Sequence, residues 1–192
     1  EDGTPYTVYT PFSKRWKRLL TAGRLERFPS EGLMDRFLKT EAFRIPTLEE
    51  LGFSGSAGWA PSREIPSGIL RNYGAARDFP GVAGTSRLGV HLRFGTVSIR
   101  KVAAMALTES EVFLGELIWR DFFASILAHF PYVAEGPFKK RYGFIAWRNK
   151  EEEFERWCQG ETGYPLVDAG MRKLRTTGFM HNRVRMVTAS FL

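Results

Sequence analysis

The second half of the chain repeats a helical pattern. From residue 85 onward, apolar residues recur three and four positions apart, in blocks separated by short turns that contain Gly or Pro. This spacing places the apolar side chains of a block on one face of an α-helix. The longest block includes Phe113, Leu117 and Phe122, whereas the β-branched alternation typical of strands is scarce. The sequence predicts a mainly α fold with helices over 13–22, 98–107, 109–129, 151–158, 165–176 and 181–192, and a short one after Thr85 and Ser86.

The first part of the chain gives weaker signals. Residues 5–10 could form a short edge strand or an extended linker. Ser13 is the expected N-cap of the first helix and Gly23 its stop, while Ser98 is the expected N-cap of a later helix. Residues 28–66 are rich in Pro, Gly and Ser, which predicts a linker or a mobile loop rather than core.

Composition narrows the classes of partner. Lys and Arg number 28 against 21 Asp and Glu, a net charge of +7 that suits a polyanion such as nucleic acid or a generic basic surface. Cys158 is the single cysteine, which excludes an internal disulfide and a cysteine-based metal site and suits the reducing cytoplasm. No apolar run reaches the roughly 18 to 20 residues of a membrane span, so no membrane partner is expected. No metal is expected either.

The run from Gly84 to Leu88 combines a glycine with two hydroxyls. Glycine lets a backbone approach a ligand closely, and Thr85 and Ser86 are expected at a helix N-terminus, where free N–H groups favour phosphate. An ordinary hydroxyl cap with no ligand explains the same residues.

One face of the predicted helix 109–129 carries mixed chemistry. Glu116, Trp119, Arg120 and Phe123 lie at i, i+3, i+4 and i+7. A carboxylate beside an indole suits a pocket in which a flat base stacks and forms hydrogen bonds. The alternative is a surface face with a Glu–Arg ion pair and a half-buried Trp.

The last predicted helix has a similar face. Asn182, Arg185 and Met186 share one side, and Arg183 points elsewhere, where it could meet a phosphate. An amide can form hydrogen bonds with a heterocycle, and a thioether can contact a flat ring. A basic surface helix is the alternative, with His181 as a structural hydrogen-bonding group.

Two tryptophans lie ten residues apart. Trp147 and Trp157, with Phe154 between them, indicate either core packing or a path for electron transfer. Basic stretches at 15–18 and 139–142 are typical of a solvated face, or of phosphate contacts beside a nucleic-acid pocket.

Five strings in order resemble the photolyase/cryptochrome family, and specifically a class I cyclobutane pyrimidine dimer photolyase. The resemblance covers residues 73–192 in the segments 77–88, 94–98, 116–122, 160–172 and 178–186. It implies an all-α, multi-helical FAD-binding domain, incomplete at its C-terminus and without the N-terminal α/β antenna domain. Residues 1–72 would then be the connector from the antenna domain, and 73–192 the first part of the FAD- and DNA-binding domain.

The resemblance also implies a set of cofactor contacts. The positions that match FAD-binding residues are Tyr73, Thr85, Ser86, Arg87, Leu88, Gly89, Arg120, Asn182 and Arg185. The hydroxyls would lie near the phosphates, and Asn182 and Arg185 beside the flavin ring. Gly89 departs from the family pattern, because a Ser often completes this phosphate-binding string.

A second set matches the family's dimer pocket and electron-transfer chain. The positions implied for catalysis are Glu116, Trp119, Asn182, Met186 and Trp147, and those implied for damaged DNA are Glu116, Trp119, Phe123, Phe179, Asn182, Arg183 and Met186. The implied activity is light-driven repair of cyclobutane dimers by reduced FAD, in a monomer. Phe179 departs from the pattern, since many dimer-repairing members have Trp there.

Three alternatives compete with dimer repair. A cryptochrome-like photoreceptor shares the fold and FAD, but a sensor has no need of a dimer pocket. The family branch that repairs (6-4) lesions has a pair of His residues near this position, whereas here His181 is followed by Asn182. A helical DNA-binding module without cofactor leaves the Gly84–Leu88 run unexplained.

Overall fold

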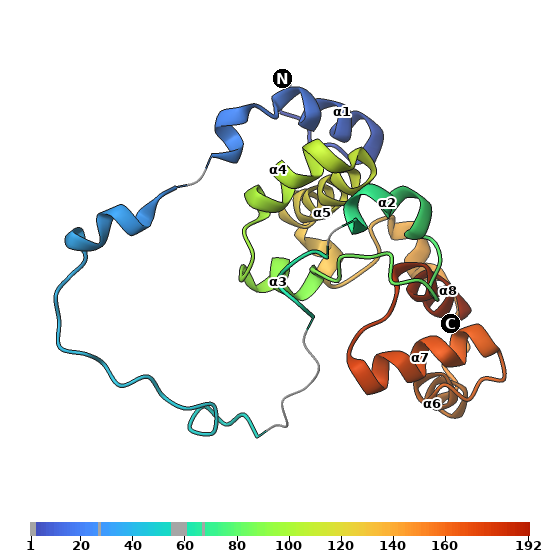
Figure 1. The fold of residues 1–192 in the computed structure, drawn as a ribbon. Helices are drawn as coiled ribbons and strands as arrows, with labels where there is room; N and C mark the ends of the chain where they lie inside the picture. The colour runs from blue at the N-terminus through green and yellow to red at the C-terminus, as the bar shows by residue number, and fades with distance from the viewer. Residues whose placement is uncertain (1–2, 27, 55–60, 67) are drawn as a thin grey trace.

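The computed structural model describes residues 3–26, 28–54, 61–66 and 68–192, and within these ranges it contains helices and no strand (Figure 1). The all-α prediction is therefore confirmed. The α-helices are α1 (Tyr9–Leu19), α2 (Ile69–Ala76), α3 (Gly89–Phe94), α4 (Ile99–Glu109), α5 (Glu111–His129), α6 (Glu151–Gln159), α7 (Pro165–Thr177) and α8 (Asn182–Phe191). Short 3-10 helices are η1 (Ala22–Leu25), η2 (Ser30–Arg36), η3 (Pro131–Ala134) and η4 (Lys140–Phe144).

The start of the chain differs from its prediction. Of the two alternatives for residues 5–10, the edge strand is wrong, and residues 5–8 lie outside any helix. Helix α1 already begins at Tyr9, so Ser13 lies inside it rather than at its cap. Tertiary contact explains the earlier start. Tyr9 and Phe12 pack against the first core, and the Tyr9 hydroxyl donates to the carbonyl of Gly115 at 3.0 Å. The helix ends at Leu19, before Gly23.

Two helices in the second half begin at side-chain caps. Ser110 Oγ accepts from the Phe113 N–H at 3.3 Å and starts α5, two residues later than predicted. His181 Nδ1 accepts from the Arg183 N–H at 3.2 Å and starts α8. Ser98 is the N-cap residue of α4, as predicted, although its side chain makes no capping hydrogen bond.

The first core joins α1, α2, α4 and α5. Ile118 and Ala106 are fully buried, and Leu70 is 2% exposed. Because α5 turns its most apolar face toward three other helices, it is the central element of this cluster (Figure 1). Trp16 adds a polar tie, since its indole N–H donates to Asp121 Oδ2 at 2.9 Å.

The second core joins α6, α7 and α8. Met171, Met180 and Val184 are buried there. Gly170 permits the close approach of α7 to α8, since a Cβ on it would lie 2.5 Å from Val184 Cγ1. The indole N–H of Trp157 donates to the Thr188 carbonyl at 2.9 Å and holds α6 against α8.

Residues 28–54, between η1 and α2, extend away from the helices in a wide arc (Figure 1). These residues are mainly exposed and carry large apolar side chains at Leu38, Phe43 and Ile45. Residues 55–60 of the predicted linker lie outside the described residues. Residues 28–54 lie outside both cores, as expected, and contain the short helix η2.

Candidate functional site

The Gly84–Leu88 loop packs on α2 before it reaches α3. A Cβ on Gly84 would lie 2.5 Å from that of Ala76, so this glycine permits the close packing of the loop on α2. Helix α3 begins at Gly89 and its N-cap is the buried Leu88, so the prediction that hydroxyls cap it is wrong. Ser86 Oγ instead accepts from the Leu88 N–H at 3.4 Å, which stabilises the turn.

Arg87 turns this loop toward the second core. Its backbone has a φ of 54°, and its guanidinium lies 5.1 Å from the centre of the Phe179 ring. A cavity of about 250 Å³ lies between the loop and the α7–α8 turn, lined in part by Thr85, Arg87, Lys173, Phe179 and His181. Two cations, a hydroxyl and an aromatic wall suit an anionic group attached to an apolar one.

This volume is small for a dinucleotide. Pockets for drug-sized ligands enclose about 300–1,000 Å³. The cavity therefore fits one part of FAD, such as a phosphate and its neighbour, and not the whole cofactor. Of the predicted FAD contacts, Thr85 and Arg87 line it, whereas Arg120, Asn182 and Arg185 do not.

Tyr73 belongs to the first core. It is 8% exposed, and its ring meets Phe113 edge-on at 4.9 Å. Burial is the largest cause that raises the pKa of its hydroxyl, with the negative charge of Glu116 adding to it. The Arg77 guanidinium lies 5.5 Å from the ring centre and closes one side of it.

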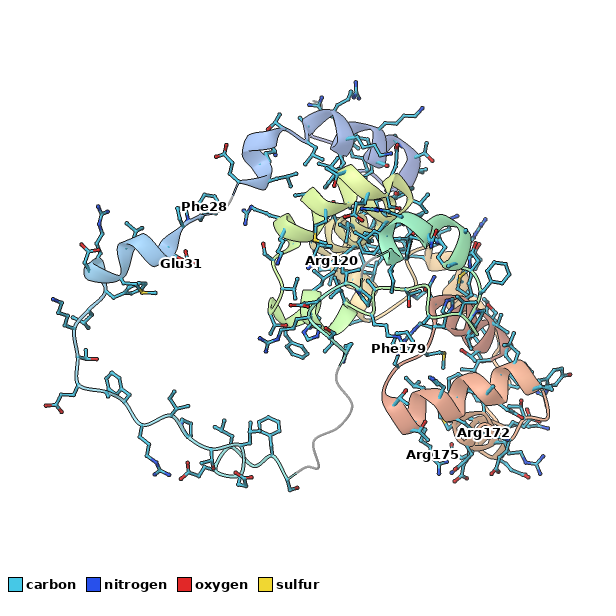
Figure 2. All side chains as sticks on the ribbon, viewed as in Figure 1. Phe28, Glu31, Arg120, Arg172, Arg175 and Phe179 are labelled. Atoms are coloured by element: carbon cyan, nitrogen blue, oxygen red, sulfur yellow. The ribbon has the colours of Figure 1, made fainter. Side chains whose placement is uncertain are left out.

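The predicted face of α5 separates into different environments. Glu116 is paired with Arg77 of the α2 end, and not with Arg120 one turn away. Arg120 instead lies 3.5 Å from Asp121 and from the Leu92 carbonyl, among α3 and α5 (Figure 2). The alternative of a Glu–Arg pair within this face is therefore wrong, because the partner of Glu116 is Arg77, 39 residues away in the sequence.

Trp119 lies in an aromatic stack. The Tyr9 ring covers one side of it at a centroid distance of 3.6 Å and an interplanar angle of 3°. Phe123 follows at 5.5 Å and 23°, and the Trp119 side remains 36% exposed. Sequence reasoning missed Tyr9, whose only signal was an aromatic residue in a presumed strand.

Helix α8 presents the other candidate residues to solvent. Asn182, Arg185 and Met186 are exposed, and the Asn182 amide lies 4.0 Å from the Met186 sulfur. Arg183 Nε donates to Asp78 Oδ1 at 2.7 Å, and Arg183 also approaches the Met186 sulfur at 3.8 Å. The hydrogen bond from Arg183 is the main cause of a lowered pKa of Asp78.

Charged contacts run without a break from α5 to α8. Glu116 meets Arg77, Arg77 Nε lies 3.4 Å from Asp78, and Asp78 meets Arg183. We call these four residues the charge bridge. It brings two regions that the sequence marked separately to opposite ends of one network, through two residues, Arg77 and Asp78, that had no assigned role.

Known proteins resemble the chain along its whole length. A family profile described as the FAD-binding domain of DNA photolyase matches residues 113–192. The deoxyribodipyrimidine photo-lyase of Salmonella typhimurium is 44% identical over 97% of this chain, and that of Synechococcus is 38% identical over 99%. The crystal structure of a bacterial class III photolyase from Agrobacterium tumefaciens superposes with a TM-score of 0.86 over the entire chain, at 31% identity.

The chain belongs to the DNA photolyase family.

The match is to part of each relative. The chain spans 44% of the Salmonella photo-lyase, 45% of the Synechococcus one and 44% of the Agrobacterium structure. An archaeal photolyase from Sulfolobus tokodaii, solved with two FAD molecules, matches 60% of this chain at 43% identity and a TM-score of 0.58. The helices described above are thus the photolyase fold over less than half of a relative's length.

The two tryptophans singled out in the sequence, Trp147 and Trp157, lie just before α6 and within it. Trp147 is 61% exposed and lines an open cavity of about 700 Å³ together with Phe154 and Trp157. The Phe154 and Trp157 rings stack at 5.7 Å and 23°. Trp157 is partly buried on the second core, so the structure gives it a packing role and leaves Trp147 at the surface.

The described residues contain neither a candidate metal centre nor a candidate membrane span. In the residues that the structure describes, no group of three His, Cys, Asp or Glu could hold a metal ion. In the same residues, no helix has the length and apolar character to cross a membrane.

Proposed function

We propose that the full gene product carrying this chain repairs cyclobutane pyrimidine dimers in DNA with light, as a deoxyribodipyrimidine photo-lyase that uses FAD. The charge bridge carries this proposal. It links Glu116, beside Trp119 on α5, to Arg183, beside Asn182 and Met186 on α8. One connected surface therefore contains a carboxylate and an indole that can bind a base, together with a guanidinium that can bind a phosphate.

FAD fits the chain in part. The Thr85 hydroxyl and the Arg87 guanidinium border a cavity of a size suited to a phosphate with its neighbouring group, and Phe179 supplies an apolar wall. Asn182 and Arg185, exposed on α8, are the groups proposed for the flavin ring. When bound in its reduced form, FAD supplies the electron that light drives into the dimer and that returns after the cyclobutane ring opens.

The protein's own side chains would bind and orient the DNA. Glu116 accepts hydrogen bonds from the edge of the flipped base, and its ion pair with Arg77 fixes the position of its carboxylate. Trp119 offers its exposed part for stacking. Arg183 binds the DNA backbone, and Phe123, Phe179 and Met186 are proposed to exclude water around the dimer. Extrusion costs least for a distorted lesion, which adds selectivity.

Trp147 is proposed as the surface end of an electron-transfer path. Its 61% exposure suits exchange of an electron with a reductant in solution. The single Cys158 is consistent with a cytoplasmic, DNA-associated protein. We also propose that the full gene product is a monomer and belongs to the class I subgroup of photolyases.

The deciding experiment combines a spectrum with a repair assay. The full gene product is purified and its visible spectrum recorded, and loss of thymine dimers from an irradiated oligonucleotide is followed under blue light and in the dark. Bound flavin with light-dependent loss supports the proposal. Bound flavin without loss favours a photoreceptor, and no flavin after addition of FAD contradicts the cofactor assignment.

A further inference from the structure

The middle of the charge bridge is a carboxylate shared by two arginines. Asp78 Oδ1 lies 2.7 Å from Arg183 Nε and 3.4 Å from Arg77 Nε. The geometry therefore favours Arg183 as the stronger partner, although Arg77 is the adjacent residue in the sequence. The ion pair to Arg183 closes the contact between α8 and the chain that follows α2.

The two arginines differ in how firmly they are held. The Arg77 side chain is 19% exposed, is paired with Glu116 and lies over the Tyr73 ring. The Arg183 side chain is 43% exposed and is held by Asp78 and by a weak contact with the Met186 sulfur. Exchange with a ligand from solution is therefore easier at Arg183 than at Arg77.

The bond from Arg183 to Asp78 has the chemistry of a phosphate contact. A guanidinium donates to anionic oxygens in the same way whether they belong to a carboxylate or to a phosphodiester. Asp78 is also accessible, with its side chain 49% exposed. A DNA phosphate that reaches Arg183 must then compete with Asp78 for the same N–H group.

We propose that Asp78 is an internal competitor of the DNA backbone: it holds Arg183 in place of a phosphate and gives it up when DNA binds. This inference rests on the proposed function, because it takes DNA as the polyanion. It assigns the two arginines different tasks. Arg77 remains with Glu116, and Arg183 changes partner.

The test is the variant Asp78→Asn in the full gene product, with binding to undamaged and dimer-containing duplexes measured across a range of salt concentrations. Without its competitor, Arg183 should bind phosphate more tightly, so that affinity for both duplexes rises about threefold to fivefold at low salt. The slope of log affinity against log salt should become steeper, because the Asp78 carboxylate that the parent frees on DNA binding attracts a cation and the amide of the variant does not.

A matched control separates this effect from net charge. Glu155→Gln changes the net charge by the same amount at an exposed position of α6. It should leave both affinity and salt slope near those of the parent. Arg183→Gln supplies the second control, since Asp78→Asn should change nothing in that background.

Each outcome decides something. Weaker DNA binding by Asp78→Asn would mean that Asp78 positions Arg183 for the phosphate, and unchanged binding and slope would mean no competition; either overturns the inference. A gain that persists with Arg183→Gln overturns it as well. Thermal unfolding of each variant shows that it is folded. If the parent repairs dimers while Asp78→Asn changes nothing, the inference fails alone; a parent that binds neither duplex overturns the proposed function too.

Discussion

Tyr9 and Trp119 are 110 residues apart in the sequence and lie face to face, with ring centroids 3.6 Å apart and planes within 3° of parallel. The Tyr9 hydroxyl donates to the Gly115 carbonyl, one turn before Trp119 on α5. One residue of α1 thus fixes both the backbone and the ring plane around a residue proposed to stack on the dimer.

Replacing Tyr9 with Leu should loosen the Trp119 indole. Aromatic pairs are worth about 0.5–1.5 kcal/mol beyond the area they bury, so we expect dimer-containing DNA to bind about threefold to tenfold more weakly. Tyr9→Phe keeps the ring and loses the hydroxyl, and should retain most of the affinity. Titration with labelled duplex measures both, and equal losses in the two variants would assign the effect to the hydroxyl and not to the stack.

Replacing Glu116 with Gln should weaken dimer binding about tenfold, since the amide loses a charge-assisted hydrogen bond of about 1.5–3 kcal/mol. Glu109→Gln is the control, because Glu109 pairs with Arg71 at 3.7 Å on the surface. Binding to dimer-containing and undamaged duplexes is compared. A similar loss for both duplexes would argue against a contact of Glu116 with the lesion.

The close contact of α7 with α8 makes Gly170 sensitive to added volume. Gly170→Ala places a methyl group 2.5 Å from Val184 Cγ1 and 2.9 Å from Thr188 Cγ2. Overpacking of this kind costs about 1–3 kcal/mol, which thermal or denaturant unfolding should reveal. Gly136→Ala meets open space and should change the unfolding free energy by less than about 0.5 kcal/mol. Equal stability of the two variants would contradict this packing.

Asp168 should make stability depend on pH in acid. Its pKa is lowered chiefly by the hydrogen bond from the Thr162 hydroxyl, with the Thr162 and Gly163 backbone N–H groups adding to it. A carboxyl whose pKa is lower in the folded state stabilises the protein above its unfolded pKa of about 3.9, and this stabilisation is lost as the pH falls through the folded value.

Melting temperatures measured from pH 7 to pH 2.5 test this. The melting temperature of the parent should exceed that of Asp168→Asn by a constant margin above about pH 5, and this margin should shrink in stronger acid. Thr162→Val, which removes the main donor, should reduce the same margin. A gap between parent and Asp168→Asn that persists unchanged at pH 2.5 would rule out the ionised carboxylate as its source.

Gly89 can accept a side chain. It is the first residue of α3, and a Cβ on it would meet nothing within 4 Å. Gly89→Ser would add a hydroxyl near Thr85 and Ser86, so FAD affinity should rise about threefold to tenfold, the value of one hydrogen bond. Gly89→Ala provides the comparison without a hydroxyl, and flavin fluorescence gives the affinity. Equal affinities of the two variants would place Gly89 away from the cofactor.

Local pattern predicted the helices that have clear apolar periodicity. The helix expected over 109–129 is α5 (Glu111–His129), and the one expected over 165–176 is α7 (Pro165–Thr177). The short α2 (Ile69–Ala76) was not predicted, because eight residues give too little periodicity. The start of α1 was missed since contact with α5, and not a cap, decides it.

The site shows the same division. Sequence identified Glu116 and Arg183 as functional candidates, and it failed to pair them with Arg77 and Asp78. Arg183 and Asp78 are 105 residues apart, so only the fold brings them together. Leu88 shows a second limit of sequence reasoning. The family resemblance marked it as a cofactor contact, and only the structure shows that its side chain is buried in the first core.

The arc between η1 and α2 has a practical consequence for anyone who handles this chain by itself. From Phe28 to Phe53 it holds many large apolar side chains in water, with Leu38 and Ile45 each 86% exposed. Contiguous apolar surface of this kind promotes self-association. Produced as an isolated piece, the polypeptide should elute earlier from a sizing column as its concentration rises, and mild detergent or removal of the arc should suppress the shift.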